Sequence, residues 1–284
     1  NRATRQRLTS LKMNQEAALR AHYDAFAEEY AGVDQATERI LSRLEISPES
    51  SILDIGCGTG NLTLHLPERT TPRQAIGIDL SCKNVNVAQK QAQASGLQNL
   101  DFLCASAGHL PFGQEVFDIV VSNLVLHLIP DQQNALAEAV RVLKPSGTAV
   151  LQFLGGGEVA PEMVEVVHDA WSDILPETEP PQLFYRLTVD TVETYLADLG
   201  IDDFQIVRRQ RVMRIGKERI ERFLGFFRLV GSFWRWGLDT EVADRIEELV
   251  NSQVMDQVES KGHFANTANH LLIEFTKPGV RATI

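Results

Sequence analysis

The chain has 284 residues, 44% of them hydrophobic and 23% charged, a composition typical of a globular protein rather than a disordered or fibrous one. The formal net charge of −11 argues against nucleic acid as a partner, because a phosphate backbone requires a basic surface. No apolar run approaches the roughly 20 residues that span a bilayer, so stable membrane insertion is not expected.

The three cysteines, Cys57, Cys82 and Cys104, are an odd number and include no C-x-x-C pair. We therefore expect no disulfide framework, no zinc site and a reducing, cytoplasmic compartment. No signal-peptide pattern opens the chain. The first residue is Asn1 rather than methionine, which fits a domain excised from a larger synthase.

The first predicted element is an amphipathic helix at residues 14–30, in which Tyr23 and Tyr30 lie on the apolar face. From residue 33 onward strand and helix signals alternate. Strands are predicted at 52–55, 75–80, 100–104, 117–122 and 148–153. Helices are predicted at 35–44, 62–66, 83–94 and 132–143, and a turn at 144–147.

Two later strands, 204–212 and 271–275, are separated by far more residues than a hairpin needs. Two helical patterns fill this interval, so we expect an insertion of about fifty residues. Its first helix is crowded by six aromatic residues, Phe223, Phe226, Phe227, Phe233, Trp234 and Trp236. They either pack between cap and core or line an apolar substrate pocket.

The alternation predicts an α/β fold with a Rossmann-like, mostly parallel, seven-stranded sheet, helices on both faces and a helical cap. We expect one domain over residues 1–284. Its core comprises residues 33–156, 186–212 and 267–278. Its cap comprises residues 1–32, 157–185 and 213–266.

Residues 51–63, SILDIGCGTGNLT, run from a strand through three closely spaced glycines into a helix. A glycine turn at this position lets backbone approach a nucleotide-sized ligand. Asn61 stands where a dinucleotide fingerprint requires its third glycine, and Asp54 lies inside the strand. The next strand ends in Asp79, which can accept two hydrogen bonds from ribose hydroxyls in either class of nucleotide cofactor.

The ordered set LDIGCGTGNLT, IGIDLS, HLPFGQEVFDIVVSNLVLHLI and EAVRVLKPSGTAVLQF resembles the class I S-adenosylmethionine-dependent methyltransferases. The similarity is to the branch of ubiquinone- and menaquinone-type small-molecule enzymes, and it covers about residues 20–155. The resemblance implies S-adenosylmethionine as the cofactor. No metal is expected, because no cluster of acids or histidines has the spacing of metal ligands.

The resemblance also implies the residues that contact this cofactor. Those expected to meet its amino-acid end are Gly56, Gly58, Gly60, Asp54 and Asn123, with Tyr23 and Tyr30 closing over it. Asp79 would hold the ribose, and Leu80 would pack on the adenine. The family usually carries Gly-Asp-Ala after the third strand. This chain has Ala105, Ser106 and Ala107 there, so a hydroxyl or backbone contact would replace a charged one.

An oxygen acceptor must lose a proton as it is methylated, and a neutral imidazole is the ordinary base near pH 7. His127 follows the fourth strand, at the expected ligand-binding edge. It is the first candidate for the base, although a packing role is equally open. His263 is the rival, and Glu158 could orient either histidine.

We therefore expect methyl transfer from S-adenosylmethionine to a small, largely apolar acceptor, at a hydroxyl. A polyketide or acyl-type intermediate of natural product biosynthesis, free or bound to a carrier protein, would fit. The alternatives are a C-methyltransferase acting on a carbon acid, an NAD-dependent oxidoreductase and a non-catalytic cofactor-binding module. The oligomeric state is left open.

Overall fold

The structure, a computed structural model, describes residues 20, 35–157, 160–180, 187–231 and 238–279, with side chains described only to residue 225 in the helix Lys217–Gly231. Tyr23, Tyr30 and Glu158 lie outside the described residues. Among the helices of these ranges, none combines the length and the apolar character of a membrane span.

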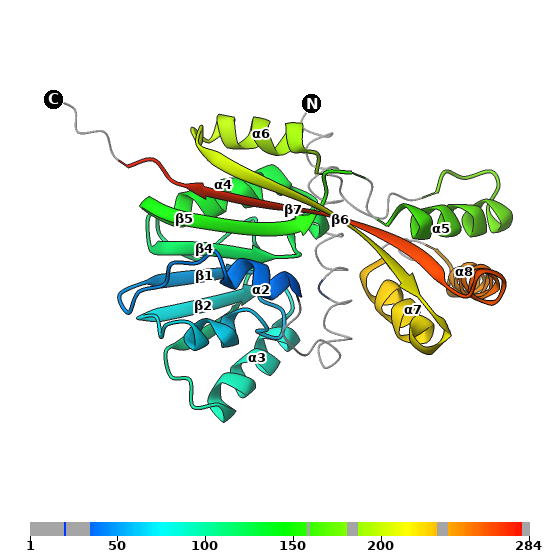
Figure 1. Cartoon of the computed structure of the whole chain (residues 1–284), viewed down its shortest axis with the longest axis horizontal. Helices are drawn as coiled ribbons and strands as arrows, with labels where there is room; N and C mark the ends of the chain where they lie inside the picture. Colours follow the sequence, from blue (N-terminus) through cyan, green and yellow to red (C-terminus); the bar gives the residue numbers. More distant parts are fainter. Residues whose placement is uncertain (1–19, 21–34, 158–159, 181–186, 232–237, 280–284) are drawn as a thin grey trace. The chain divides into compact units, whose positions relative to one another are not determined.

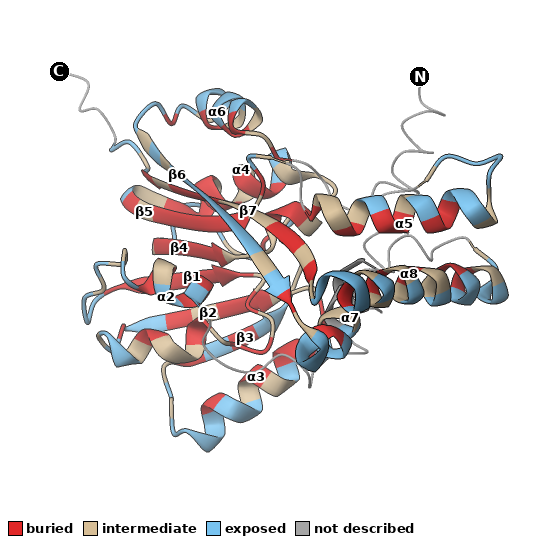
Figure 2. Cartoon of the chain, turned by 45° about the vertical axis from the view of Figure 1, so that its right-hand side comes forward, coloured by how far each residue is buried: buried red, intermediate tan, exposed pale blue. Residues whose placement is uncertain are grey.

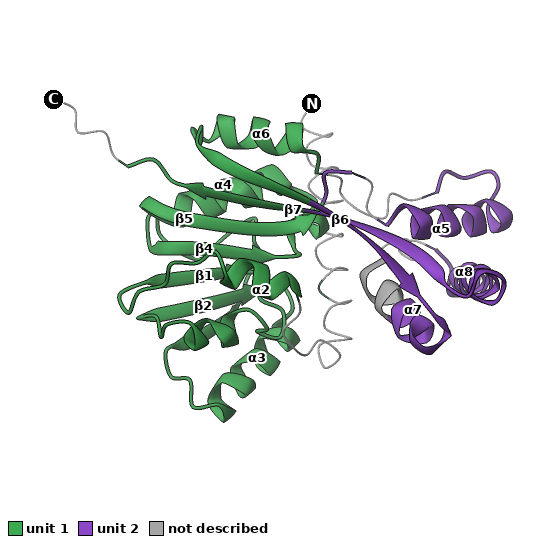
Figure 3. Ribbon diagram, in the orientation of Figure 1, with its two compact units in different colours: residues 1–154, 187–208, 271–284 green, residues 155–186, 209–270 purple. Residues whose placement is uncertain are grey.

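The chain divides into two compact units, which Figure 3 distinguishes by colour. Unit 1 consists of the described residues of 1–154, 187–208 and 271–284. Unit 2 consists of those of 155–186 and 209–270. The expectation that 157–185 and 213–266 form a cap stays a prediction.

Within the described residues, seven strands form one sheet in the order β3-β2-β1-β4-β5-β7-β6. In chain order the strands are β1 Ser51–Ile55, β2 Gln74–Asp79, β3 Leu100–Cys104, β4 Phe117–Asn123, β5 Leu143–Leu154, β6 Phe204–Ile215 and β7 Phe264–Thr276. The first five pair in parallel, and Figure 1 shows β7 running opposite to β5. This mostly parallel sheet confirms the predicted fold class.

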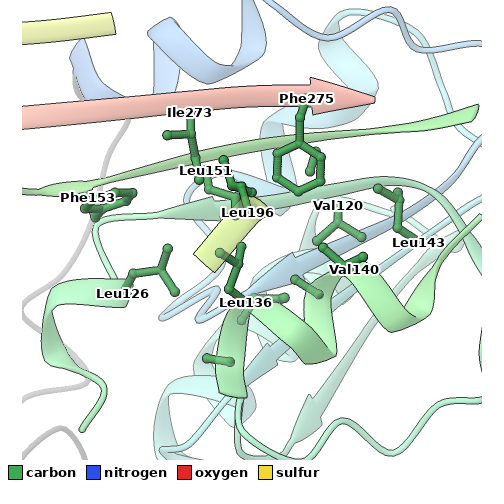
Figure 4. Close-up of a cluster of buried hydrophobic side chains, with 14 of the residues drawn as sticks. Val120, Leu126, Leu136, Val140, Leu143, Leu151, Phe153, Leu196, Ile273 and Phe275 are labelled. Carbon is green, nitrogen blue, oxygen red and sulfur yellow. The ribbon is translucent and has the colours of Figure 1, made fainter. Parts of the chain in front are cut away.

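Helices cover both faces of the sheet because side chains of a strand alternate between its two faces. One core contains Leu53 and Ile55 of β1 together with α4 (Gln132–Val142) and α6 (Val189–Asp198), as Figure 4 shows in part. The other contains Ile52 with α2 (Gln35–Leu41) and α3 (Cys82–Ala94). Figure 2 shows the buried strands between these helical layers.

Several boundaries differ from prediction. The expected helix 62–66 is the 3₁₀ helix η1 (Thr63–Glu68), which contains Pro67. The expected turn 144–147 lies inside β5, where Ser146 takes a positive φ of 62° and the pairing of β4 with β5 shifts register. A β-bulge therefore accommodates the turn-forming residues without ending the strand.

In unit 2, helix α8 (Thr240–Lys261) contacts both α5 (Pro161–Ile174) and α7 (Lys217–Gly231). The helices α7 and α8 confirm the two helical patterns predicted for the insertion. Phe223 packs on Phe264 with ring centroids 5.8 Å apart. The side chains of Phe226 and Phe227 are not described, and Phe233, Trp234 and Trp236 lie outside the described residues.

The expectation of no disulfide was wrong, because Cys82 and Cys104 form one. The two residues are 22 apart in sequence, and neither their spacing nor the odd cysteine count indicates pairing. The sheet brings them together. Strand β3 pairs with β2 so that Cys104 lies opposite Asp79, and α3 begins three residues after Asp79. Cys57 remains a buried free thiol.

Candidate functional site

The turn after β1 is held tightly against β2. The backbone N–H groups of Gly56 and Cys57 both donate to the carbonyl of Ile78, at 2.7 and 2.8 Å. Gly56 has a φ of +73°, and a Cβ atom there would overlap the Val125 side chain. Only glycine suits both conditions. Gly58 also has a positive φ, of +56°, but a Cβ there would face open space, which leaves its backbone accessible to a ligand.

Asp79 connects this turn to the end of β2. Its Oδ2 accepts a hydrogen bond from the Gly58 N–H at 2.9 Å. Its Oδ1 accepts from the Ser81 N–H at 2.8 Å and from Asn84 Nδ2 at 3.3 Å. The carboxylate is only half-buried, so it remains within reach of a ligand. A half-buried carboxylate at the end of β2 can accept hydrogen bonds from two adjacent ribose hydroxyls.

Asp54 lies below the turn and is 1% exposed. Burial and, to a lesser extent, the nearby Asp79 charge raise its pKa to about 7, and the hydrogen bonds from Thr63, which lower the pKa, do not offset the desolvation. Asp54 Oδ2 accepts from Thr63 Oγ1 at 2.6 Å, whereas the buried Oδ1 has no hydrogen-bond partner within the described part of the chain. A cationic ligand beside this carboxyl would favour its ionised form.

The loop after β3 contains the residues expected at the adenine. Ser106 Oγ accepts a hydrogen bond from the Gly108 N–H at 3.3 Å, so the hydroxyl already stabilises its own turn. Ala107 packs against the apolar core beside the sheet. The backbone of Ala105 donates to the Asp79 carbonyl at 2.9 Å, which places Ala105, Ser106 and Leu80 at adjacent strand ends.

Asn123 ends β4 inside a polar network that sequence reasoning missed. Its Nδ2 donates to Thr37 Oγ1 at 3.2 Å, and its Oδ1 accepts from Gln152 Nε2 at 2.8 Å. Arg39 Nε in turn donates to Gln152 Oε1 at 2.7 Å. These bonds attach α2 to the carboxyl ends of β4 and β5. Gln152 and Thr37 are almost fully buried, and a glutamine in the middle of an apolar strand was the available signal.

The segment after β4 is strained next to the glycine turn. Leu124 has a φ of 59°, a value unusual for a residue with a side chain, and its N–H donates to the Gln152 carbonyl at 2.6 Å. This bend directs Val125 against Gly56. Positive φ values in bulky residues gather at functional sites because surrounding contacts must hold them there.

His127 lies in the 3₁₀ helix η2 (Leu126–Leu128) and is 3% exposed. Its Nδ1 accepts a hydrogen bond from the Leu154 N–H at 3.4 Å. That bond requires the proton of the neutral ring to be on Nε2. In this tautomer the ring donates through Nε2, and a role as base would require Nδ1 to release the Leu154 N–H.

The other two catalytic candidates are not joined to this cluster by any described contact. His263 belongs to unit 2, in the short connection between α8 and β7, where its Nδ1 lies 3.2 Å from the Lys261 carbonyl oxygen. Glu158 and both tyrosines, Tyr23 and Tyr30, are outside the described residues. Within the described chain no group of three or more His, Cys, Asp or Glu side chains has metal-ligating geometry.

The described site thus offers an open backbone turn, a half-buried carboxylate and an unpartnered carboxyl oxygen at the carboxyl ends of β1, β2 and β4. The open space at Gly58 fits the main-chain atoms of an amino acid, and the buried Asp54 carboxyl below the turn would favour a positive charge near it. Asp79 fits a ribose. A nucleoside attached to an amino acid suits this arrangement.

Residues 53–151 match the family model described as a methyltransferase domain. The chain is 33% identical over 137 residues to a malonyl-[acyl-carrier protein] O-methyltransferase of Marinomonas sp., covering 48% of this chain and 49% of that protein. It is 34% identical over 112 residues to a demethylmenaquinone methyltransferase of Lactobacillus johnsonii, covering 39% and 46%. The matched part therefore spans about half the length of these relatives.

Among solved structures, the YcgJ protein of Bacillus subtilis superposes with a TM-score of 0.59 at 21% identity. The superposition covers 86% of this chain and 98% of that protein, and it supports the fold.

Proposed function

We propose, on the premise that residues 53–151 form a class I S-adenosylmethionine-dependent methyltransferase domain, that the chain methylates a small, largely apolar acceptor at a hydroxyl group. The observation that carries the proposal is the hydrogen bond from the Gly58 N–H to Asp79, because it joins the two strand ends that a nucleoside with an amino-acid tail would occupy.

Each part of the cofactor has residues suited to hold it. Asp79 would accept hydrogen bonds from the ribose, and Leu80 with Ser106 would contact the adenine. Asp54 would face the ammonium group, with Gly56, Gly58 and Gly60 around the amino-acid backbone. When bound, S-adenosylmethionine supplies a methyl group on a sulfonium, whose leaving group is a neutral thioether. The protein then has to position the acceptor in line and exclude water.

The proton of a hydroxyl acceptor needs a destination, and His127 remains our first candidate. It lies on the segment that contacts the glycine turn through Val125. To act as a base at Nε2, the ring would first have to carry its proton on Nδ1 instead, and it would then lose the hydrogen bond from the Leu154 N–H. His263, with Glu158 as its orienter, is the alternative base.

Product analysis separates oxygen from carbon methylation. The test incubates the chain with S-adenosylmethionine and a panel of apolar alcohols, phenols and β-keto thioesters. Mass spectrometry should show one added methyl group, and proton–carbon NMR of the product should show that this methyl group is bonded to oxygen. A methyl group bonded to carbon would instead identify a C-methyltransferase. Binding of NAD but not S-adenosylmethionine in calorimetry, or binding with no turnover of any acceptor, would contradict the proposal.

A carrier-bound acyl acceptor is the second form of this proposal. The relative from Marinomonas sp. is named for such a substrate. Residues 209–222 of this acidic chain contain six basic and two acidic residues. The basic ones, all exposed, are Arg209, Arg211, Arg214, Lys217, Arg219 and Arg222. An acidic carrier protein would be attracted to such a surface.

Charge reversal tests this form directly. Arg209→Glu/Arg211→Glu should raise the KM for an acyl group on an acidic carrier protein, and leave the KM for the same acyl group on a small thiol unchanged. Arg73→Glu/Lys90→Glu, which reverses two exposed charges far from residues 209–222 in the sequence, is the matched control. Equal effects of both variants would reject docking at residues 209–222.

A further inference from the structure

The Cys82–Cys104 disulfide lies beside the expected adenosine contacts. Cys82 is the first residue of α3, directly after Asp79, Leu80 and Ser81. Cys104 is the last residue of β3 and pairs with Asp79 in the parallel register. The Cα atoms of the two cysteines are 5.0 Å apart, and Cys104 Sγ lies 3.6 Å from the Leu80 carbonyl oxygen.

The bridge therefore closes a short ring around Leu80. One side of this ring is the segment from Asp79 to Cys82, and the other is the β2–β3 pairing at Cys104, continued by the bond from the Ala105 N–H to the Asp79 carbonyl. Both cysteines are exposed, so external thiols can reach the sulfurs. The third cysteine, Cys57, is buried, and burial raises the pKa of its thiol, so it is a poor competitor.

We propose that Cys82 and Cys104 are a reversible redox modification site that controls affinity for the cofactor. In the oxidised chain the bridge holds Leu80 and the Asp79 carboxylate in the arrangement described above. Reduction releases the start of α3 from the end of β3. The Asp79–Ser81 segment then has to become ordered when the cofactor binds, and this ordering subtracts from the free energy of binding. Ordering a binding segment in advance strengthens affinity, and releasing it weakens affinity.

The chemistry is thiol–disulfide exchange with an external dithiol as reductant. A thiolate of the dithiol attacks Cys104 Sγ, the Sγ–Sγ bond breaks, and Cys82 leaves as a thiolate that the first turn of the 13-residue helix α3 stabilises. The second thiolate of the reagent then displaces Cys104. Two electrons and two protons pass to the cysteines, and the reagent becomes a cyclic disulfide. An external disulfide reverses the process through a mixed disulfide at Cys82.

The test measures S-adenosylmethionine affinity of the full chain by calorimetry, before and after treatment with dithiothreitol. A chromogenic thiol reagent under denaturing conditions should count one thiol in the oxidised chain and three in the reduced chain. We expect the Kd to rise about threefold or more on reduction and to return after reoxidation with oxidised glutathione.

Serine variants separate the bridge from the individual side chains. Cys82→Ser, Cys104→Ser and the double variant should share the Kd of the reduced native chain, because each one abolishes the same bond. None should respond to dithiothreitol. A Kd equal in oxidised and reduced native chain, or three thiols after oxidation, would overturn the inference. Absence of binding in both states would instead reject the proposed function, which this test otherwise leaves untouched.

Discussion

The Asp79 carboxylate receives three hydrogen bonds from its own chain, from Gly58, Ser81 and Asn84. Its orientation is therefore determined before a ligand arrives. Asp79→Ala should weaken S-adenosylmethionine binding by more than ~1 kcal/mol, because the bonds to the ribose and the order of the glycine turn are both lost. Isothermal calorimetry measures this, with Asp101→Ala, an exposed acid on β3, as the control. Equal losses in both variants would reject the assignment.

Asp54 predicts a dependence of stability on pH. Its pKa of about 7 in the folded chain exceeds the ordinary 3.8, so folding favours the protonated carboxyl. The corresponding stability is complete below pH 3.8 and is lost as the pH rises through 7. In the absence of cofactor, the Asp54→Asn variant should be more stable than the native chain at pH 8, because a neutral amide replaces an ionised, buried carboxyl. Its free energy of unfolding should be higher by more than ~1 kcal/mol.

Urea titrations at pH 5 and pH 8 test this prediction. The difference in free energy of unfolding between the variant and the native chain should be smaller at pH 5 than at pH 8. The same variant should bind S-adenosylmethionine more weakly, because the amide cannot pair with an ammonium group. A variant that is less stable than the native chain at pH 8 would show that the ionised carboxyl is already compensated.

His127 is nearly buried, so a loss of activity on substitution has two possible origins. If the ring is the base, His127→Gln should lower kcat by ~10²-fold or more with cofactor affinity retained, and the native kcat should fall as the pH decreases through the imidazole pKa. The matched control is His109→Gln, an exposed histidine. If His127→Gln keeps most of its kcat, the role passes to His263.

At the scale of the elements, the turn from β1 to η1 requires a glycine at position 56. Gly56→Ala should destabilise the chain by ~1–3 kcal/mol, through both a positive φ and overlap with Val125. The double variant Gly56→Ala/Val125→Ala should recover part of that loss, since it removes the overlap but leaves the backbone strain. Urea unfolding measures both. No recovery would mean that backbone strain alone determines the cost.

The edge strand β6 lacks the alternation of buried and exposed residues that is usual for a strand. Residues 207–212 are all exposed, and Val207 and Val212 are 40% and 54% exposed. Arginines Arg208, Arg209 and Arg211 lie between them. Charged residues on an edge strand oppose pairing with another chain, so these arginines protect the edge of the sheet whether or not they also bind a partner.

For the molecule as a whole, unit 1 contains every described residue that we assign to the cofactor. S-adenosylmethionine at 100 times its Kd should raise the free energy of unfolding by about 2.7 kcal/mol. Hydrogen exchange should slow at the Gly56–Gly60 turn, at the segment after Asp79 and in the loop after β3. Helix α8 serves as the internal reference. Protection confined to α8 would place the cofactor in unit 2 and contradict the assignment.

The sequence by itself predicted the strands, the helices and the glycine turn, because each depends on interactions between residues that are close in the chain. The alternation of strands and helices, the glycine turn after β1 and the acid at the end of β2 each depend on residues close together in the chain. The parallel α/β fold follows, since helices that alternate with short buried strands leave few other ways to cover a sheet.

The tertiary structure alone decided which distant residues meet. The Cys82–Cys104 bridge depends on the register of β2 with β3, and the network of Asn123, Gln152 and Arg39 depends on where α2 packs. The tautomer of His127 depends on the Leu154 N–H of a neighbouring strand end. Such contacts join residues 22 to 113 positions apart, and no local pattern specifies them, because packing of the sheet determines the pairing.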